Sequence, residues 1–140
     1  MTRILALATA ASLAGLTGCG DTCSSKPASV DSLAGQCGTV AAGTAVTIGL
    51  QLCPTCADSS PSCTGEVRPG NVIELDSVVQ QCQAQAGCNI SGCNISPVGC
   101  QLDQPLQGGQ TYTVRYLDAS GNLASTTVTA QSGGSSSCTL

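Results

Sequence analysis

The sequence contains no histidine, no tryptophan and no phenylalanine, and its only aromatic residues are two tyrosines. Without histidine, a Ser-His-Asp triad cannot be assembled from this chain. Aromatic side chains bury about 150–250 Å² each and usually dominate the energetics of a core. The core must therefore be built from aliphatic side chains, alanine and cystine.

Charge is also scarce, with four basic and eight acidic residues and a formal net charge of −4. No basic patch is present, which argues against a nucleic-acid partner. Glu66, Glu74, Asp76 and Asp103 could form a carboxylate pair or a calcium site, but no EF-hand spacing occurs. Scattered acids of this kind are usually solvated surface, so we predict neither a metal site nor a cofactor.

Cysteine, in contrast, is abundant, with 11 copies in 140 residues. This density is typical of disulfide scaffolds in oxidising compartments. The odd count leaves one cysteine over, and chain order alone does not fix the pairing of the others. We predict that ten cysteines form disulfides: Cys23, Cys37, Cys53, Cys56, Cys63, Cys82, Cys88, Cys93, Cys100 and Cys138. Five bridges at roughly 2–4 kcal/mol each would rival the whole stability of a domain.

The first 19 residues have the features of an export signal. Arg3 precedes an uncharged apolar stretch of 13 residues at 4–16. That length lies within the roughly 7–15 residues of a signal core and below the roughly 20 of a membrane-spanning helix. The stretch ends in Leu16-Thr17-Gly18-Cys19, which resembles the lipobox of bacterial lipoproteins.

This resemblance implies that residues 1–18 are a signal peptide and that Cys19 becomes the first mature residue. Its thiol would carry diacylglycerol, and its amino group is often acylated in that family. The lipid would anchor the protein in a membrane of the bacterial cell envelope, with the outer membrane as the expected location. The alternative is an ordinary secretory signal in which Cys19 joins the disulfide cysteines.

The mature part fits one domain with two flexible ends. Residues 19–36 are rich in Ser, Gly, Ala and Asp and predict a tether. We expect the domain at 37–131 and a flexible Ser/Gly tail at 132–140. Cys138 should pair back to the domain, with an intermolecular bridge as the alternative.

Within the domain the patterns favour strands. Apolar residues alternate with Thr, Gly and Gln at 46–52, which predicts a strand with one buried face. Turn-forming residues predict a loop at 53–70. A strand is favoured at 72–76, whereas 77–86 fits either a strand or a helix. Alternation at 112–116, a turn at 119–122 and a Thr-rich return at 123–130 predict a hairpin.

The order Leu106-x-x-Gly109-x-x-Tyr112-x-Val114, followed by this hairpin, resembles the last two strands of fibronectin type III and bacterial immunoglobulin-like domains. The resemblance covers about residues 102–130. It implies that the Tyr112 hydroxyl bonds to backbone just upstream, as in a tyrosine corner. The expected fold is therefore all-β, a small disulfide-rich immunoglobulin-like β-sandwich.

Two cysteine motifs invite a functional interpretation. Cys53-Pro54-Thr55-Cys56 has the CxxC form of thiol–disulfide oxidoreductases, but no βαβ pattern precedes it and no helix follows to lower a thiolate pKa. Four thiolates from this motif, Cys63 and the later cysteines could bind zinc, yet a second CxxC pair is missing. Structural disulfides are the favoured interpretation of both.

Residues 88–96 hold a tandem repeat of Cys-Asn-Ile-Ser. Its Asn, Ser and Gly residues predict a disulfide-stapled, turn-rich segment. The functional alternative is a rigid surface loop that recognises a partner. Asn89 and Asn94 lie in Asn-x-Ser sequons, which are usually unused in a bacterial lipoprotein.

Together these observations predict a non-catalytic, lipid-anchored cell-envelope protein with a binding or structural role. Its partners would be the membrane, through lipid on Cys19, and an envelope protein or glycan. The alternative is a thiol–disulfide oxidoreductase that acts through Cys53 and Cys56.

Overall fold

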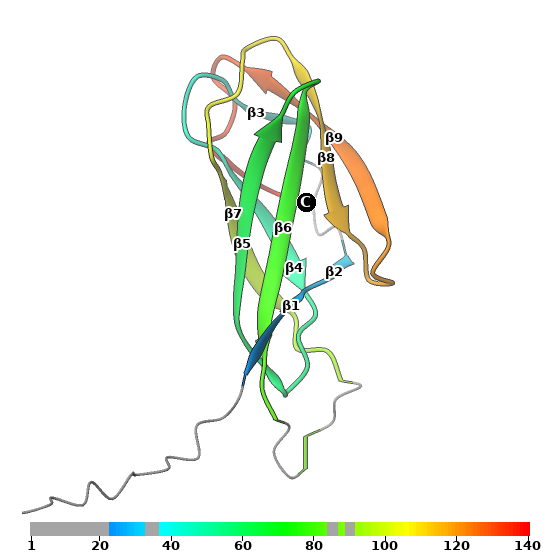
Figure 1. Ribbon diagram of the computed structural model, residues 1–140. Coiled ribbons are helices and arrows are strands. Elements are labelled where there is room, and N and C mark those ends of the chain that lie inside the picture. Colours follow the sequence, from blue (N-terminus) through cyan, green and yellow to red (C-terminus); the bar gives the residue numbers. More distant parts are fainter. Residues whose placement is uncertain (1–22, 33–36, 84–86, 89–91) are drawn as a thin grey trace, which may run out of the picture.

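The computed structural model describes residues 23–32, 37–83, 87–88 and 92–140 (Figure 1). The regular structure in these residues is entirely β, which confirms the predicted class. The strands are β1 (Ser24–Pro27), β2 (Val30–Ser32), β3 (Thr39–Ala41), β4 (Thr47–Leu52), β5 (Asp58–Arg68), β6 (Val72–Gln81), β7 (Ser96–Leu102), β8 (Thr111–Leu117), β9 (Leu123–Gln131) and β10 (Ser137–Thr139).

The ten strands belong to one continuous, curled sheet. Its order is β10-β4-β7-β5-β6-β8-β9-β3, with β1 beside β6 and β2 beside β4. The β5–β6 hairpin runs the length of the molecule, and the β8–β9 hairpin lies beside it (Figure 1). Immunoglobulin sandwiches consist of two antiparallel sheets. Here β5 pairs with β7, and β6 with β8, in parallel.

The curl brings the two ends of the sheet together. A bridge joins Val40 of β3 to Ser135, just before β10, and the Ala41 amide donates to the Ser135 carbonyl at 2.8 Å. A Cβ at Gly134 would collide with the Val40 carbonyl, so this close approach requires glycine. The Cys37–Cys138 disulfide covalently joins the same two ends.

The interior is aliphatic, as the lack of Phe and Trp requires. Along β4, Ile48, Leu50 and Leu52 are at most 1 % exposed and alternate with partly exposed residues. This confirms the period-two pattern read at 46–52 and shows which face of β4 is buried. Both tyrosines are buried as well, Tyr112 at 3 % and Tyr116 at 7 % exposure.

The loop predicted at 53–70 is wrong for most of its length, because β5 occupies Asp58–Arg68. Backbone pairing with β6 outweighs the turn-forming composition of the segment. Pro61 is tolerated because it lies between Ser59 and Ser62, where the β5–β6 register shifts. Proline is compatible with such an irregularity, since it has no amide to donate.

The ambiguous segment after residue 76 continues as a strand to Gln81. Ile73, Leu75, Ser77 and Val79 are buried along one face of β6. This period of two excludes the helical alternative over 77–81, and residues 84–86 lie outside the described part. The predicted β8–β9 hairpin is confirmed, with Thr111 paired to Thr129 and Leu117 to Leu123.

The predicted flexible ends need correction where the structure describes them. β1 and β2 pair with β6 and β4, and Val30 is only 2 % exposed. At the other end β10 pairs with β4, and Leu140 is 2 % exposed. Residues 24–32 and 137–140 therefore belong to the domain, because burying their apolar side chains stabilises the sheet.

The predicted signal peptide at 1–18 and the lipidation site Cys19 lie outside the described residues. In the described part of the chain, no helix is long and apolar enough to cross a membrane.

Candidate functional site

Three of the five disulfides gather at one end of the domain, which we call the disulfide end. They are Cys23–Cys82, Cys53–Cys93 and Cys56–Cys88. This end is formed by residues 53–57 and by the described residues of the β6–β7 connection. Of the remaining bridges, Cys63–Cys100 joins β5 to β7, and Cys37–Cys138 joins the residues just before β3 to β10.

All ten predicted disulfide cysteines are thus paired, and Cys138 bonds within the chain as expected. Cys53 and Cys56 are not bonded to each other, because each is paired with a cysteine of the β6–β7 connection. The structure therefore lacks the Cys53–Cys56 disulfide on which the oxidoreductase alternative depends.

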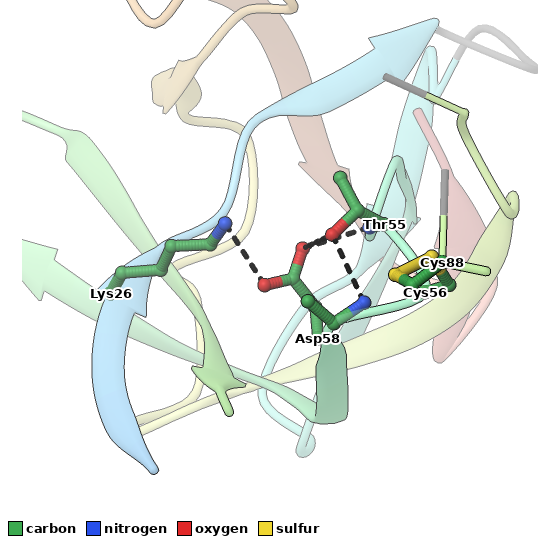
Figure 2. The surroundings of a disulfide bond; sticks show 6 residues. Lys26, Thr55, Cys56, Asp58 and Cys88 are labelled. Carbon is green, nitrogen blue, oxygen red and sulfur yellow. Dashed lines mark hydrogen bonds and ion pairs between the residues drawn. A yellow bond between two sulfur atoms is a disulfide. The ribbon is translucent and has the colours of Figure 1, made fainter. Parts of the chain in front are cut away.

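Asp58, two residues after the CxxC motif, forms an ion pair with Lys26 of β1 that sequence reasoning missed. Figure 2 shows Asp58 between Thr55 and Lys26: Oδ2 accepts hydrogen bonds from the Thr55 amide at 2.8 Å and hydroxyl at 2.9 Å. Oδ1 lies 2.9 Å from Lys26 Nζ, and the Asp58 side chain is 2 % exposed.

Burial by itself raises the pKa of Asp58, since it disfavours the charged form. The hydrogen bonds from Thr55 and the contact with Lys26 outweigh burial, so that the pKa lies below the usual value. The carboxylate is therefore held ionised, as in a structural pair that joins β1 to the start of β5. A general acid or base would need a pKa closer to neutral.

The zinc possibility also fails, because Cys53, Cys56 and Cys63 are all oxidised to disulfides. Among the described residues, Asp31, Cys53 and Cys93 place potential ligand atoms within 4.8 Å of one another. Cys53 and Cys93 are bonded as a disulfide, so neither sulfur is a thiolate that could coordinate zinc.

The four acids considered for a cation or carboxylate site do not converge. Glu66 and Glu74 face each other across β5 and β6, and both contact Arg68, at 2.7 and 3.1 Å. Asp103 accepts the Val67 amide at 2.9 Å, while Asp76 is exposed. The arrangement is a partly exposed ion-pair network, which contributes little to stability.

The end of the domain opposite the disulfides, which we call the far end, carries a hollow of about 320 Å³. The β5–β6 turn forms one wall, and the β7–β8 connection forms the other. Its lining residues are Val67, Arg68, Pro69, Gly70, Asn71, Gln104, Pro105, Gln107 and Tyr112. Amide side chains and prolines therefore dominate this surface.

Hydrogen bonds across the hollow hold its walls in place. Gln104 Nε2 donates to the Val67 carbonyl at 2.9 Å, and Asn71 Nδ2 donates to Gln110 Oε1 at 3.1 Å. The Tyr112 hydroxyl accepts the Gln107 amide at 2.8 Å. This last bond confirms the predicted tyrosine corner and fixes the β7–β8 connection against β8.

Sequence reasoning singled out Tyr112 but not the amides around it. Asn71, at φ 58°, occupies the left-handed region beside Gly70, and the Pro-Gly-Asn sequence of this turn was the available signal. Nothing in the sequence places the turn beside Gln104 and Gln107, because the two segments meet through the parallel pairings of β5 with β7 and of β6 with β8.

The predicted stapled segment at 88–96 is confirmed where it is described. Cys88 and Cys93 are bonded to the loop that precedes β5, and the Asn94 amide donates to the Pro54 carbonyl at 2.9 Å. Asn89 lies outside the described residues.

No protein-family model, no curated protein and no solved structure matches this chain.

Proposed function

We propose that this protein is a non-catalytic cell-envelope lipoprotein, anchored through lipid on Cys19, whose rigid β-domain presents a binding surface. The observation that carries the proposal is the division of the cysteines. Five disulfides use every cysteine except the one that follows Leu16-Thr17-Gly18. A scaffold of stable disulfides fits an exported protein in an oxidising compartment.

The anchor is tested by expressing the full chain in a Gram-negative bacterium as wild type, as Cys19→Ser and as the matched control Ser24→Ala. We expect the wild type and the control to enter the detergent phase and to yield an N-terminal peptide with the mass of lipidated Cys19. Cys19→Ser should stay in the aqueous phase, because one residue carries the whole anchor. Lipid-free wild-type protein would refute the proposal.

The binding role is assigned to the far-end hollow. Its lining of amides, prolines and a tyrosine offers neutral hydrogen-bonding groups and apolar surface, which suits an envelope glycan better than a charged ligand. Arg68, the one charged lining residue, is already paired with Glu66 and Glu74. Gln104 and Asn71 each use a side-chain NH2 group to hold the walls, so the Gln107 amide and the side-chain oxygens of Gln104 and Asn71 are the main groups offered to a ligand.

Glycan binding is tested by co-sedimentation of the wild-type protein with purified peptidoglycan sacculi. Gln107→Ala should weaken binding, because Gln107 lines the hollow and the substitution removes its side-chain amide. Gln81→Ala removes an exposed glutamine at the disulfide end and serves as the control. Equal binding by both variants would exclude the hollow as the glycan site.

The likeness to immunoglobulin-like domains is proposed only for β8, β9 and the Tyr112 corner. These elements match in strand order, hairpin and hydrogen bond. The parallel pairing of β6 with β8 distinguishes the rest of the domain from that family.

A further inference from the structure

The chain enters the folded domain at the disulfide end. β1 begins at Ser24, which pairs with Gln81, and the preceding Cys23 is bonded to Cys82 with a Cα–Cα distance of 4.1 Å. In Figure 1, β1 starts at the lower end of the molecule, where the β4–β5 and β6–β7 connections also lie. A lipid on Cys19 would therefore be attached to this end.

The connection between the lipid and the domain is short. Four peptide steps separate Cys19 from Cys23, and an extended chain of that length reaches at most about 14 Å. The polar interface of one bilayer leaflet is itself about 5–8 Å thick. Because Cys23 is fixed to Cys82, the disulfide end cannot stand far from the lipid headgroups.

The side chains of the disulfide end are suited to that position. Residues 53–57 and 77–102 contain no charged residue. Nearby, Asp58 is buried and paired with Lys26, and Asp31 lies beside the Cys53–Cys93 disulfide. Asp31 and Asp21, which lies in the connection itself, are therefore the acids that would stay in the polar headgroup region, and the rest of this end has little charge to desolvate when it meets a bilayer.

An exposed apolar side chain marks the same end. Ile95 is 58 % exposed, one of two large hydrophobic residues exposed in the described part of the chain. The backbone next to it is held in place, since Asn94 donates to Pro54 and Cys93 is bonded to Cys53. Ile95 is thus presented on a rigid, uncharged surface.

We propose that the disulfide end docks on the surface of the bilayer that holds the Cys19 lipid, with Ile95 entering the interface. This inference rests on the proposed lipidation of Cys19. A lipid surface is the occupant because the three residues between Cys19 and Cys23 leave no room for a folded partner between this end and the headgroups. The far-end hollow then points away from the membrane.

The chain has no tryptophan, so a single introduced tryptophan reports its own depth. The test uses the full lipidated protein, verified by mass, in zwitterionic phosphatidylcholine vesicles with and without brominated acyl chains. Ile95→Trp should shift its emission to the blue and be quenched several-fold more strongly than Gln107→Trp at the far end. Gln83→Trp, another exposed position at the disulfide end, replaces Ile95→Trp if that variant does not fold.

Equal quenching at the two ends, or a water-like spectrum for Ile95→Trp, would overturn the docking. A flexible Gly/Ser insertion after Gly20 should reduce the quenching of Ile95→Trp, and unchanged quenching would overturn the role of the short connection. Failure of the proposed function is a separate result, since wild-type protein would then carry no lipid mass.

Discussion

The disulfide between Cys37 and Cys138 joins the two ends of the curled sheet, and its removal should be costly. Replacing both residues by alanine leaves the other four bridges intact. In the unfolded chain the shortest covalent path between these positions then runs through Cys53–Cys93. It comprises 16 residues from Cys37 to Cys53 and 45 from Cys93 to Cys138.

A loop of about 60 residues corresponds to a loop-closure entropy of about 4 kcal/mol at room temperature. We expect the free energy of unfolding to fall by that amount. The native state adds a smaller loss, because Cys37 is 5 % exposed and its sulfur packs in the core.

The matched comparison is the double alanine variant of Cys56 and Cys88, which also removes one bridge and no charge. This bridge lies inside the loop that Cys53–Cys93 closes. Cys56 is three positions from Cys53, and Cys88 is five positions from Cys93. The remaining loop of about eight residues gives an entropy of about 2.5 kcal/mol. The losses of the two variants should therefore differ by roughly 1.5–2 kcal/mol. Loop lengths taken from the sequence separations alone, 101 and 32 residues, would predict a smaller difference.

The assay is urea unfolding of both variants and of wild type, followed by far-UV circular dichroism. The free energy is obtained by linear extrapolation, with the slopes compared because a lost cross-link exposes more of the unfolded chain. Equal losses, or a greater loss for the Cys56–Cys88 variant, would refute the nested-loop reasoning.

Three further predictions concern the scaffold. Full reduction and alkylation should abolish the strand signal in far-UV circular dichroism. An unchanged spectrum would show that the aliphatic core holds the fold without the disulfides. Asp58→Asn should cost about 1.5–3 kcal/mol at neutral pH by removing charge-assisted bonds to Lys26 and the nearby turn. Because the folded-state pKa is lowered, the wild-type contribution is present above the usual aspartate pKa and is lost as the pH falls through the folded value. Unfolding midpoints across that range should therefore converge for the two proteins, and a constant gap would contradict the assignment. Tyr112→Phe should cost about 1 kcal/mol by leaving a backbone amide without its acceptor. Tyr116→Phe, whose hydroxyl has no hydrogen bond to the described residues, is the control, and equal midpoints would exclude the corner as a stabilising contact.

The elements that were predictable are those whose signal is local. The alternation at Ile48, Leu50 and Leu52 identified β4 and its buried face, because side chains on a strand point alternately to two sides. The turn at 119–122 and the alternation around Tyr112 identified the β8–β9 hairpin, and the resemblance carried by residues 106–114 implied the hydrogen bond of the Tyr112 hydroxyl. In each case neighbouring residues contain the whole pattern.

The elements that were missed depend on partners far away in the chain. The sequence of β5 predicts a loop, because its composition favours turns. In the folded domain β6 provides its hydrogen-bond partners, and Pro61 lies at a shift of the β5–β6 register. β1, β2 and β10 are short and polar in composition, and they become strands only beside β6 and β4. The hollow could not be predicted either, because its two walls are distant segments brought together by parallel pairing.

The sequence alone determined that this protein relies on cystine and aliphatic side chains, since it has no histidine, tryptophan or phenylalanine. It also determined the all-β class and the cysteine count from which one residue is left over. Only the tertiary structure decided which cysteines pair. It bonds Cys53 and Cys56 to different partners, and it places three bridges where the chain enters the sheet. Pairing is a matter of distance in the folded state, and ten cysteines in chain order are compatible with very many sets of distances.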